Sequence, residues 1–218
     1  MNALISDFDG TITSTDFFVL ARQFVPPSEP DYLTMYRAGR ITHFDAMAAY
    51  FAHIPTDPET LDTLVRGTRP DPEFGAAAAR LAEASWDLII VSAGSSWYID
   101  SVLQIAGVRA TVRANPGRIV EGKGLVLSKP PRDSPFYSEQ VGIDKPAVVH
   151  DALERYQTVA FAGDGPQDLA PALLVRPELR FARRFLAEEF GRRNEGFRPF
   201  ERWSAIVDTL LADNPGAR

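Results

Sequence analysis

The stretch ALISDFDGT, residues 3–11, decides the fold of this chain. Its first four residues form an apolar run that ends in a serine, which predicts a short buried strand. Asp7 and Asp9 follow directly, one residue apart, with Gly10 behind them. Ligands bind at the carboxyl ends of strands in open α/β sheets, so the two carboxylates can face one crevice and share a cation. Two solvated aspartates in a turn would not need the apolar run before them.

The composition allows a sizeable hydrophobic core. The chain has 218 residues, of which 45% are hydrophobic, enough for one large or two small domains. It has no cysteine, which excludes disulfides, thiolate metal sites and a cysteine nucleophile and agrees with a reducing cytosol. No segment has the pattern of a secretory signal or the apolar length of a membrane span. We therefore expect a cytoplasmic protein without a membrane partner.

The charge is mixed and slightly acidic. The chain has 23 Lys and Arg against 29 Asp and Glu, for a net charge of -6, and the two signs are interspersed. The short basic clusters Arg183-Arg184 and Arg192-Arg193 are expected to be solvated faces of helices. Binding to a phosphate backbone needs a basic face, so the sequence predicts no nucleic-acid partner.

Residues 14–71 differ in texture from the rest of the chain. Their apolar residues recur at spacings of three and four, which predicts helices, and prolines stand where these helices would end. The first series is Phe17, Leu20, Ala21 and Phe24, and the second is Ile41, Phe44, Met47, Ala48 and Phe51. We interpret this segment as a small helical cap domain, inserted into a core made of residues 1–13 and 72–218.

The core alternates strand and helix signals, which predicts an α/β fold with a Rossmann-like parallel sheet. The runs at 87–92 and 158–162 are continuously apolar, as in strands buried on both faces. A further strand and a hairpin-like excursion are expected at 108–113 and 119–127. Helices are expected at 74–84, 96–106, 146–156, 182–192 and 201–212, and the last residues, 214–218, are expected to be frayed.

Two phosphate-binding features are predicted where these elements meet. Ser92 ends the strand 87–92, and the backbone N–H groups of Ala93 and Gly94 behind it can close on an anion. Lys145 stands at the start of the helix 146–156. Each feature is weak by itself, but their order along the chain brings both to the same sheet edge as Asp7.

A second source of carboxylates follows the strand 158–162. Asp164 and Asp168 straddle the start of a helix, and the glycines at 163 and 165 allow the chain to turn sharply. Oxygen ligands from Asp7, Asp9 and Asp164, without cysteine or a histidine nearby in sequence, favour Mg²⁺ over zinc or copper. The three histidines are interpreted as structural; they are His43, His53 and His150.

The order of these motifs resembles the phosphatase branch of the haloacid dehalogenase superfamily. The motifs are DFDGT at 7–11, Ser92, KP at 145–146 and GDGPQD at 163–168, and the resemblance covers most of the chain. It implies that Asp7 is the nucleophile that forms an aspartyl-phosphate, and that Asp9 is the general acid and base. It also implies an Mg²⁺ cofactor.

The same resemblance assigns the remaining residues of the site. Asp7 and Asp164 would hold the metal with their side chains and Asp9 with its backbone carbonyl, while Asp168 would support the metal site from behind. The phosphoryl group would be held by Gly10, Thr11, Ser92, Ala93, Gly94 and Lys145.

The helical insert resembles the cap of the phosphoserine-phosphatase-like group, which closes over the substrate. Asp16 matches a position where that group has an acidic residue that contacts the substrate, typically Glu; with Phe18 and Phe44 it forms the expected specificity set. The runs KPAVVH at 145–150 and FAR at 181–183 are similar to the methionine-salvage phosphatases that act on 2-hydroxy-3-keto-5-methylthiopentenyl-1-phosphate. Phosphoserine, phosphocholine-like and pyridoxal-phosphate substrates are the alternatives.

In each case the expected partner is a small phosphorylated metabolite, and the chain is expected to be a monomer or a homodimer. A catalytically silent phosphometabolite-binding protein on the same fold is a function of another class. Loss of Asp7, Asp9 or Lys145 would mark it, and all three are present. A phosphonatase needs a lysine in the cap, but residues 16–64 contain none, and a dehalogenase has no use for Asp9.

Overall fold

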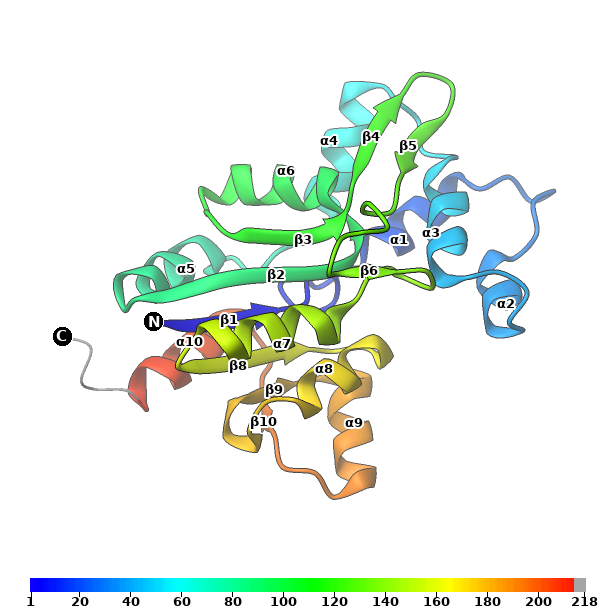
Figure 1. The fold of residues 1–218 in the computed structure, drawn as a ribbon. Helices are drawn as coiled ribbons and strands as arrows, with labels where there is room; N and C mark the ends of the chain where they lie inside the picture. The colour runs from blue at the N-terminus through cyan, green and yellow to red at the C-terminus, as the bar shows by residue number, and fades with distance from the viewer. Residues whose placement is uncertain (214–218) are drawn as a thin grey trace.

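The computed structural model describes residues 1–213; residues 214–218, expected to be frayed, lie outside the described part. Six parallel strands form one sheet in the order β10-β9-β8-β1-β2-β3 (Figure 1). This confirms the predicted α/β fold with a parallel sheet. The strands are β1 (Asn2–Ser6), β2 (Trp86–Ser95), β3 (Thr111–Asn115), β8 (Thr158–Gly163), β9 (Arg180–Ala182) and β10 (Arg198–Pro199).

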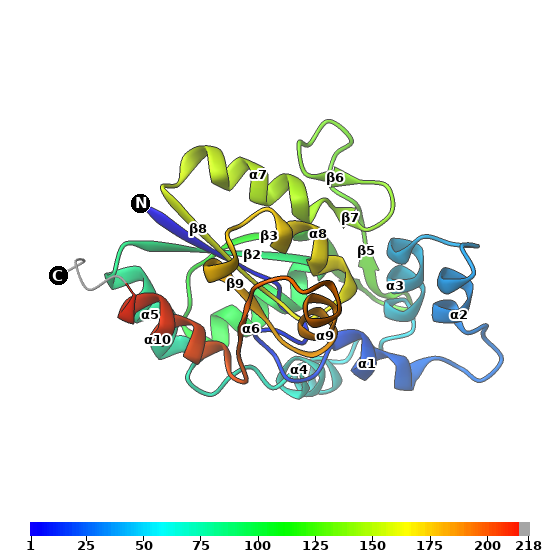
Figure 2. The same ribbon diagram turned by 90° about the horizontal axis from the view of Figure 1, so that it is seen from below.

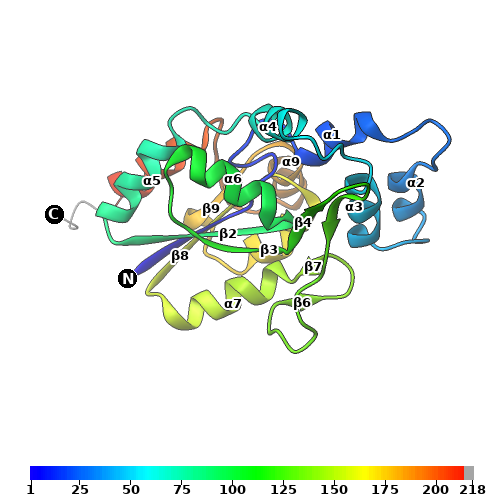
Figure 3. The same ribbon diagram turned by 90° about the horizontal axis from the view of Figure 1, so that it is seen from above.

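Helices cover both faces of the sheet, which is why its central strands are apolar on both sides. On β1, Leu4 packs toward one face, and Ala3 and Ile5 toward the other. Figure 3 shows α5 and α6 on one side of the sheet and α7 on the other. The first layer is α5 (Phe74–Glu83), α6 (Ser96–Ala106) and α10 (Trp203–Ala212); the second is α7 (Lys145–Arg155), α8 (Leu169–Leu173) and α9 (Arg184–Arg193).

Four helices lie between β1 and α5 in the chain, in the segment that the sequence assigned to a cap. They are α1 (Phe17–Ala21), α2 (Tyr32–Arg37), α3 (His43–Phe51) and α4 (Pro58–Gly67). Figure 2 shows α1, α2 and α3 grouped at the end of the sheet away from the N-terminus and α10. The segment that leads from β1 into α1 and the segment that leads from α4 to α5 run side by side, since the N–H of Thr15 donates to the carbonyl of Thr68 over 3.0 Å. The division of the chain into a cap domain of residues 14–71 and a core stays a prediction.

Two small antiparallel pairs link the core to α3. The first is β4 (Gly117–Val120) with β5 (Gly124–Leu127), the predicted hairpin, and the second is β6 (Tyr137–Ser138) with β7 (Gly142–Ile143). A Cβ on Gly124 would come within 2.5 Å of the carbonyl oxygen of Phe51, so β5 passes close beneath the end of α3. At the start of α3, the N–H of Phe44 donates to the carbonyl of Gln140 over 3.0 Å. Both ends of α3 therefore touch the core.

The structure corrects two boundaries near the site. β2 continues through Ser95, so Ser92, Ala93 and Gly94 belong to the strand, and α6 follows without a loop. The Ser95 hydroxyl oxygen caps α6 by accepting from the N–H of Trp97 over 3.2 Å. The helix expected from residue 182 begins at Arg184 instead, because the residues before it pair with β8 as the short strand β9.

Within residues 1–213, no helix combines the length and the apolar content that a bilayer crossing requires.

Candidate active site

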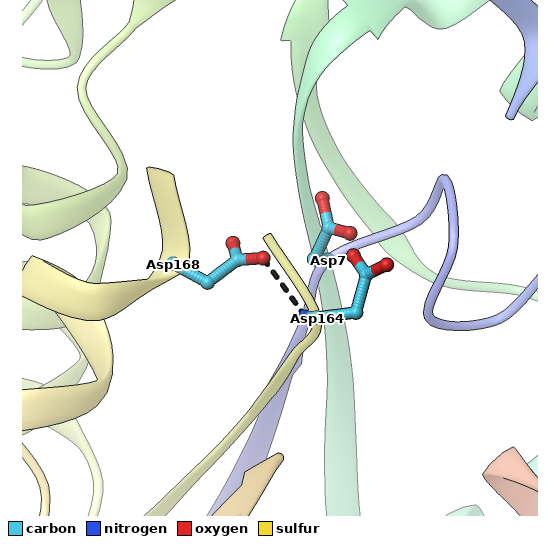
Figure 4. Close-up of side chains that lie close together, drawn as sticks. All are labelled: Asp7, Asp164 and Asp168. Carbon is cyan, nitrogen blue, oxygen red and sulfur yellow. Dashed lines mark hydrogen bonds between the residues drawn. The ribbon is translucent and has the colours of Figure 1, made fainter. Parts of the chain in front are cut away.

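Three aspartates meet where β1 and β8 end. Asp7 follows β1, Asp164 follows β8, and Asp168 lies in the 3₁₀ turn Pro166–Asp168. One carboxylate oxygen from each lies within 4.8 Å of the others (Figure 4). Asp168 is fixed by the chain around it, because its Oδ2 accepts hydrogen bonds from the N–H groups of Asp164 at 3.0 Å and Gly165 at 2.9 Å.

Lys145 joins this cluster from the first turn of α7. Its buried Nζ donates to Oδ1 of Asp7 and to Oδ1 of Asp168, each over 2.7 Å. Burial alone would lower the pKa of Lys145, but the two carboxylates raise it, so the ammonium group stays charged. The hydroxyl group of Thr11 donates to the other oxygen of Asp7, Oδ2, over 3.0 Å. The Asp7 carboxylate is thus held from both sides.

The cluster carries more negative than positive charge. Burial raises the pKa of Asp7, and the charge of Asp168 raises it further, against the effect of Lys145. Burial, together with Asp168, raises the pKa of Asp164 to about 6. Buried carboxylates with so little compensation favour a bound cation. An all-oxygen donor set is also the set that Mg²⁺ prefers, so the residues present fit that ion.

The Asp9 side chain faces a different partner. Its Oδ1 accepts from the N–H of Phe17 over 2.8 Å, and its Oδ2 accepts from the hydroxyl group of Tyr98 over 2.5 Å. The three-carboxylate cluster therefore contains Asp168 and not the Asp9 carboxylate, while the expected role of the Asp9 backbone carbonyl at the metal stays a prediction. Burial raises the pKa of Asp9 to about 7. A carboxyl group with such a pKa can both release and take up a proton near neutrality.

A cavity of about 180 Å³ opens above these groups. From the core, β2 contributes Ser92, Ala93 and Gly94, and the polar floor is formed by the carboxylates and Lys145. From the insert, the lining residues are Asp16, Phe18, His43, Met47 and Phe51. Asp16 and Phe18 thus lie where the specificity prediction needs them.

The third predicted specificity residue, Phe44, is not part of the cavity wall. Its ring faces the ammonium group of Lys129, with Nζ 5.0 Å from the ring centroid. The first turn of α3 instead turns His43 toward the cavity, which explains why the neighbouring residue faces away.

Two glycines keep the site open. Gly10 has a φ of +77°, and a Cβ there would lie 2.2 Å from Oδ2 of Asp164. A Cβ on Gly94 would lie 1.7 Å from the hydroxyl oxygen of Tyr98. Gly10 therefore allows Asp164 to approach, and Gly94 leaves room for the group that binds Asp9.

Arg183 contradicts the expectation of a solvated helix face, whereas Arg184 is exposed as expected but also contacts the site. The guanidinium group of Arg183 donates to the carbonyls of Gly10 over 2.6 Å and Thr13 over 2.8 Å. Arg184 donates to Oδ2 of Asp164 over 3.1 Å and to the carbonyl of Ser14 over 2.8 Å. Both arginines thus hold the chain between β1 and α1 against the start of α9. The pair at 192–193 bonds to Glu189 with largely exposed guanidinium groups, as a solvated face would.

His43 and Tyr98 are site residues that the sequence did not reveal. Tyr98 lies in the first turn of α6, 89 residues from the carboxylate it contacts, so no local pattern marks it. His43 was interpreted as structural, yet it lines the cavity, and no partner in the described chain bonds to its buried Nδ1. Burial, assisted by Lys145, lowers the pKa of His43 to about 4.

Comparison with known proteins places this site in a family. The model of haloacid dehalogenase-like hydrolases matches residues 4–172. Two curated relatives are named 2-hydroxy-3-keto-5-methylthiopentenyl-1-phosphate phosphatase. The protein from Geobacillus kaustophilus is 26% identical over 95% of this chain and 94% of its own length. The protein from Brevibacillus brevis is 24% identical over 85% of this chain and 84% of its own length.

Solved structures share the fold. A phospho-aspartyl intermediate analogue of phosphoserine phosphatase has a TM-score of 0.65 at 13% identity, over 94% of this chain and 97% of that chain. A phosphoserine phosphohydrolase-like protein from Francisella tularensis has a TM-score of 0.64 at 17% identity, over 97% of this chain and 100% of that chain. At such identities the likeness concerns the fold alone. On the family match and the fold together, this chain belongs to the haloacid dehalogenase-like hydrolases.

Proposed function

We propose that this hydrolase is a Mg²⁺-dependent phosphatase that cleaves a small phosphorylated metabolite through an aspartyl-phosphate on Asp7. The observation that carries the proposal is the setting of the Asp7 carboxylate. It lies at the floor of the cavity, held between the ammonium group of Lys145 and the hydroxyl group of Thr11, with Asp164 beside it. A held carboxylate facing a cavity is placed to attack a bound phosphoryl group.

In this mechanism the two aspartates of the first motif divide the work. An oxygen of Asp7 attacks phosphorus, and the bond between phosphorus and the leaving-group oxygen breaks while Asp9 gives the leaving-group oxygen a proton. Asp9 then takes a proton from the water that hydrolyses the aspartyl-phosphate, which restores Asp7 and releases phosphate. The bonds from Tyr98 and Phe17 keep the Asp9 carboxylate in one orientation during both steps.

The remaining residues neutralise and orient the phosphoryl group. Lys145 and the hydroxyl group of Ser92 would hold its oxygens. The other phosphate-binding residues would be Gly10, Thr11, Ala93 and Gly94, which lie at the same ends of β1 and β2.

The metal site would be shared by the chain's carboxylates. Asp7 and Asp164 would hold Mg²⁺ with their side chains, and Asp9 with its backbone carbonyl; when bound, the ion supplies positive charge to the phosphoryl oxygens. Asp168 has a different role, because two N–H groups and Lys145 already occupy its carboxylate. It would orient Lys145 and the Asp164 backbone.

The substrate we propose is 2-hydroxy-3-keto-5-methylthiopentenyl-1-phosphate. The names of the two curated relatives support it. So do the apolar side chains of Phe18, Met47 and Phe51, which line the part of the cavity formed by the insert and suit a methylthio tail. Helices α1–α4 would act as the cap that shields this substrate from water.

The test is Mg²⁺-dependent phosphate release from a panel of five esters: the methylthiopentenyl phosphate, phosphoserine, phosphocholine, pyridoxal phosphate and phenyl phosphate. We expect the highest kcat/KM for the first, and no release by Asp7→Asn. Asp62→Asn is a matched control, because Asp62 pairs with Arg66 on the exposed face of α4. Binding of these esters without turnover of any would contradict the proposal and favour a silent binding protein.

A further inference from the structure

Within the described residues, the fold uses the His43 ring for packing and forms no hydrogen bond to its Nδ1. His43 is the first residue of α3, but the start of that helix is capped by its neighbours. The N–H of Asp45 donates to the hydroxyl oxygen of Thr42 over 3.0 Å, and the N–H of Thr42 donates back to the Asp45 carboxylate over 3.1 Å. The ring itself packs edge-on against Tyr36, at 5.4 Å between centroids. That contact needs an aromatic ring but no nitrogen.

One of the two ring nitrogens, Nδ1, is placed where polarity is costly. Nδ1 is enclosed by protein and has no hydrogen-bond partner in the described part of the chain. An enclosed acceptor without a donor is tolerated more easily than an enclosed N–H without an acceptor. The favoured tautomer therefore carries its hydrogen on Nε2, the nitrogen left to serve the cavity that His43 lines.

The His43 ring is also uncharged near neutral pH. Burial and the nearby Lys145 lower the pKa of His43 to about 4, so a neutral imidazole faces the cavity near neutral pH. A neutral N–H donor matches a carbonyl or hydroxyl oxygen. It does not supply the charge that a carboxylate or a second phosphate needs when it leaves water.

The rest of the cavity wall agrees with an uncharged leaving group. Among the lining residues, Lys145 is the one lysine or arginine, and two carboxylates already bind it. On the side of the insert, Asp16 adds a carboxylate, and the nearby guanidinium group of Arg184 is already paired with Asp16 at 3.7 Å and with Asp164 at 3.1 Å. Phe18 and Met47 there offer only apolar surface. A second anionic group on the substrate would find no unpaired lysine or arginine among these lining residues.

We propose that His43 determines specificity by donating a hydrogen bond from Nε2 to a carbonyl or hydroxyl oxygen of the leaving group. The substrates selected in this way are phosphate monoesters whose leaving group is uncharged, carries such an oxygen, and ends in an apolar tail. This inference rests on the proposed phosphatase function and adds the chemical class of its substrate.

The decisive experiment compares two substitutions at this position on two substrates. His43→Leu replaces the imidazole with an apolar side chain and so removes the Nε2–H donor. His43→Gln places an amide N–H near the position of Nε2. The substrates are the methylthiopentenyl phosphate, which has a keto and a hydroxyl oxygen, and phenyl phosphate, which has neither. Turnover is measured as kcat/KM with saturating Mg²⁺.

We expect His43→Leu to lower kcat/KM for the methylthiopentenyl phosphate by roughly 10- to 100-fold, the effect of losing one hydrogen bond to a buried oxygen. Phenyl phosphate should change by less than about threefold. His43→Gln should recover part of the loss. The control His53→Leu alters a histidine of the same insert that contacts Tyr32 outside the cavity wall, and should leave both substrates unchanged.

Thermal unfolding separates recognition from a structural role. His43→Leu removes an unpartnered buried nitrogen and also the ring that packs on Tyr36, two opposing effects, so its melting temperature should change little. Equal losses on both substrates, or no loss on either, would overturn the proposal. So would a wild-type preference for phosphoserine over the uncharged ester. If the wild type hydrolyses no ester at all, the phosphatase function itself is wrong.

Discussion

The hydroxyl group of Tyr98 donates a hydrogen bond to Oδ2 of Asp9 over 2.5 Å. Tyr98 is buried and stacks on Phe17, with ring centroids 4.1 Å apart, and the N–H of Phe17 binds the other oxygen of the same carboxylate. One aromatic pair therefore fixes both oxygens of the proposed acid and base. Phe17 is the first residue of α1, so the orientation of Asp9 is coupled to the position of the insert.

Tyr98→Phe should lower kcat about tenfold, because the packing remains while Asp9 loses one of the two bonds that orient it. The melting temperature should change little. Tyr156→Phe is the matched control, since Tyr156 donates to Asp87 over 2.8 Å away from the cavity. Steady-state kinetics on phenyl phosphate and on the methylthiopentenyl phosphate check this. Equal rates for Tyr98→Phe and the wild type would remove Asp9 orientation from the mechanism.

Asp164→Asn should raise the Mg²⁺ concentration for half-maximal activity at least about tenfold, because it removes one of two carboxylate ligands. Calorimetric titration with Mg²⁺ should show the same weakening without any substrate.

A chelator should silence the wild type. Calcium should inhibit, since it accepts looser coordination and can engage both oxygens of the nucleophile. Turnover with calcium equal to that with magnesium would contradict the site.

Asp16→Ala should reduce kcat/KM for the preferred metabolite by roughly tenfold more than for phenyl phosphate. Asp16 lines the cavity and precedes α1 without making a capping hydrogen bond, so the helix loses little when the carboxylate is removed. The same loss on both substrates would place Asp16 in the catalytic or structural machinery. Unchanged rates would make it an ordinary helix-start residue.

His43 makes the free energy of unfolding depend on pH. Its pKa is about 4 in the folded chain and 6.5 in the reference state, so between these values the unfolded chain binds more protons. The free energy of unfolding therefore keeps the full contribution of His43 above about pH 6.5. As pH falls toward 4, this contribution is lost, by at most roughly 3 kcal/mol. Urea unfolding of the wild type and His43→Leu measures it: the wild type should lose more stability over this interval. Parallel pH profiles would contradict the shift.

The sequence predicted the central fold because its signals are local. The apolar runs that became β1, β2 and β8 are buried on both faces by helices, and such runs are visible without neighbours. β9 and β10 have three and two residues, too few for a pattern of their own. β9 forms because it pairs with the edge of β8, and β10 forms because it pairs with β9, so both depend on tertiary structure.

The residues of the candidate site also divide into those with a local sequence signal and those placed by tertiary structure. The motif residues Asp7, Lys145 and Asp164 were found because each stands at a strand end or helix start in the expected order. The contacts of Arg183 reach Gly10 across 173 positions, and the side of α3 that faces the cavity depends on how the insert docks. No spacing in the sequence encodes either, so the sequence predicts a solvated Arg183 and favours Phe44 over His43 as a cavity residue.

The central claim is that Asp7 becomes phosphorylated during turnover. In the direct measurement, the wild type is mixed with Mg²⁺ and the preferred ester, quenched within one turnover, reduced with borohydride and digested for mass spectrometry. An acyl phosphate reduced in this way leaves homoserine, which should appear at position 7. Asp7→Asn should lose roughly a thousandfold or more in kcat and show no such product. Steady turnover with position 7 unmodified in the wild type, or modification at another carboxylate, would contradict the account.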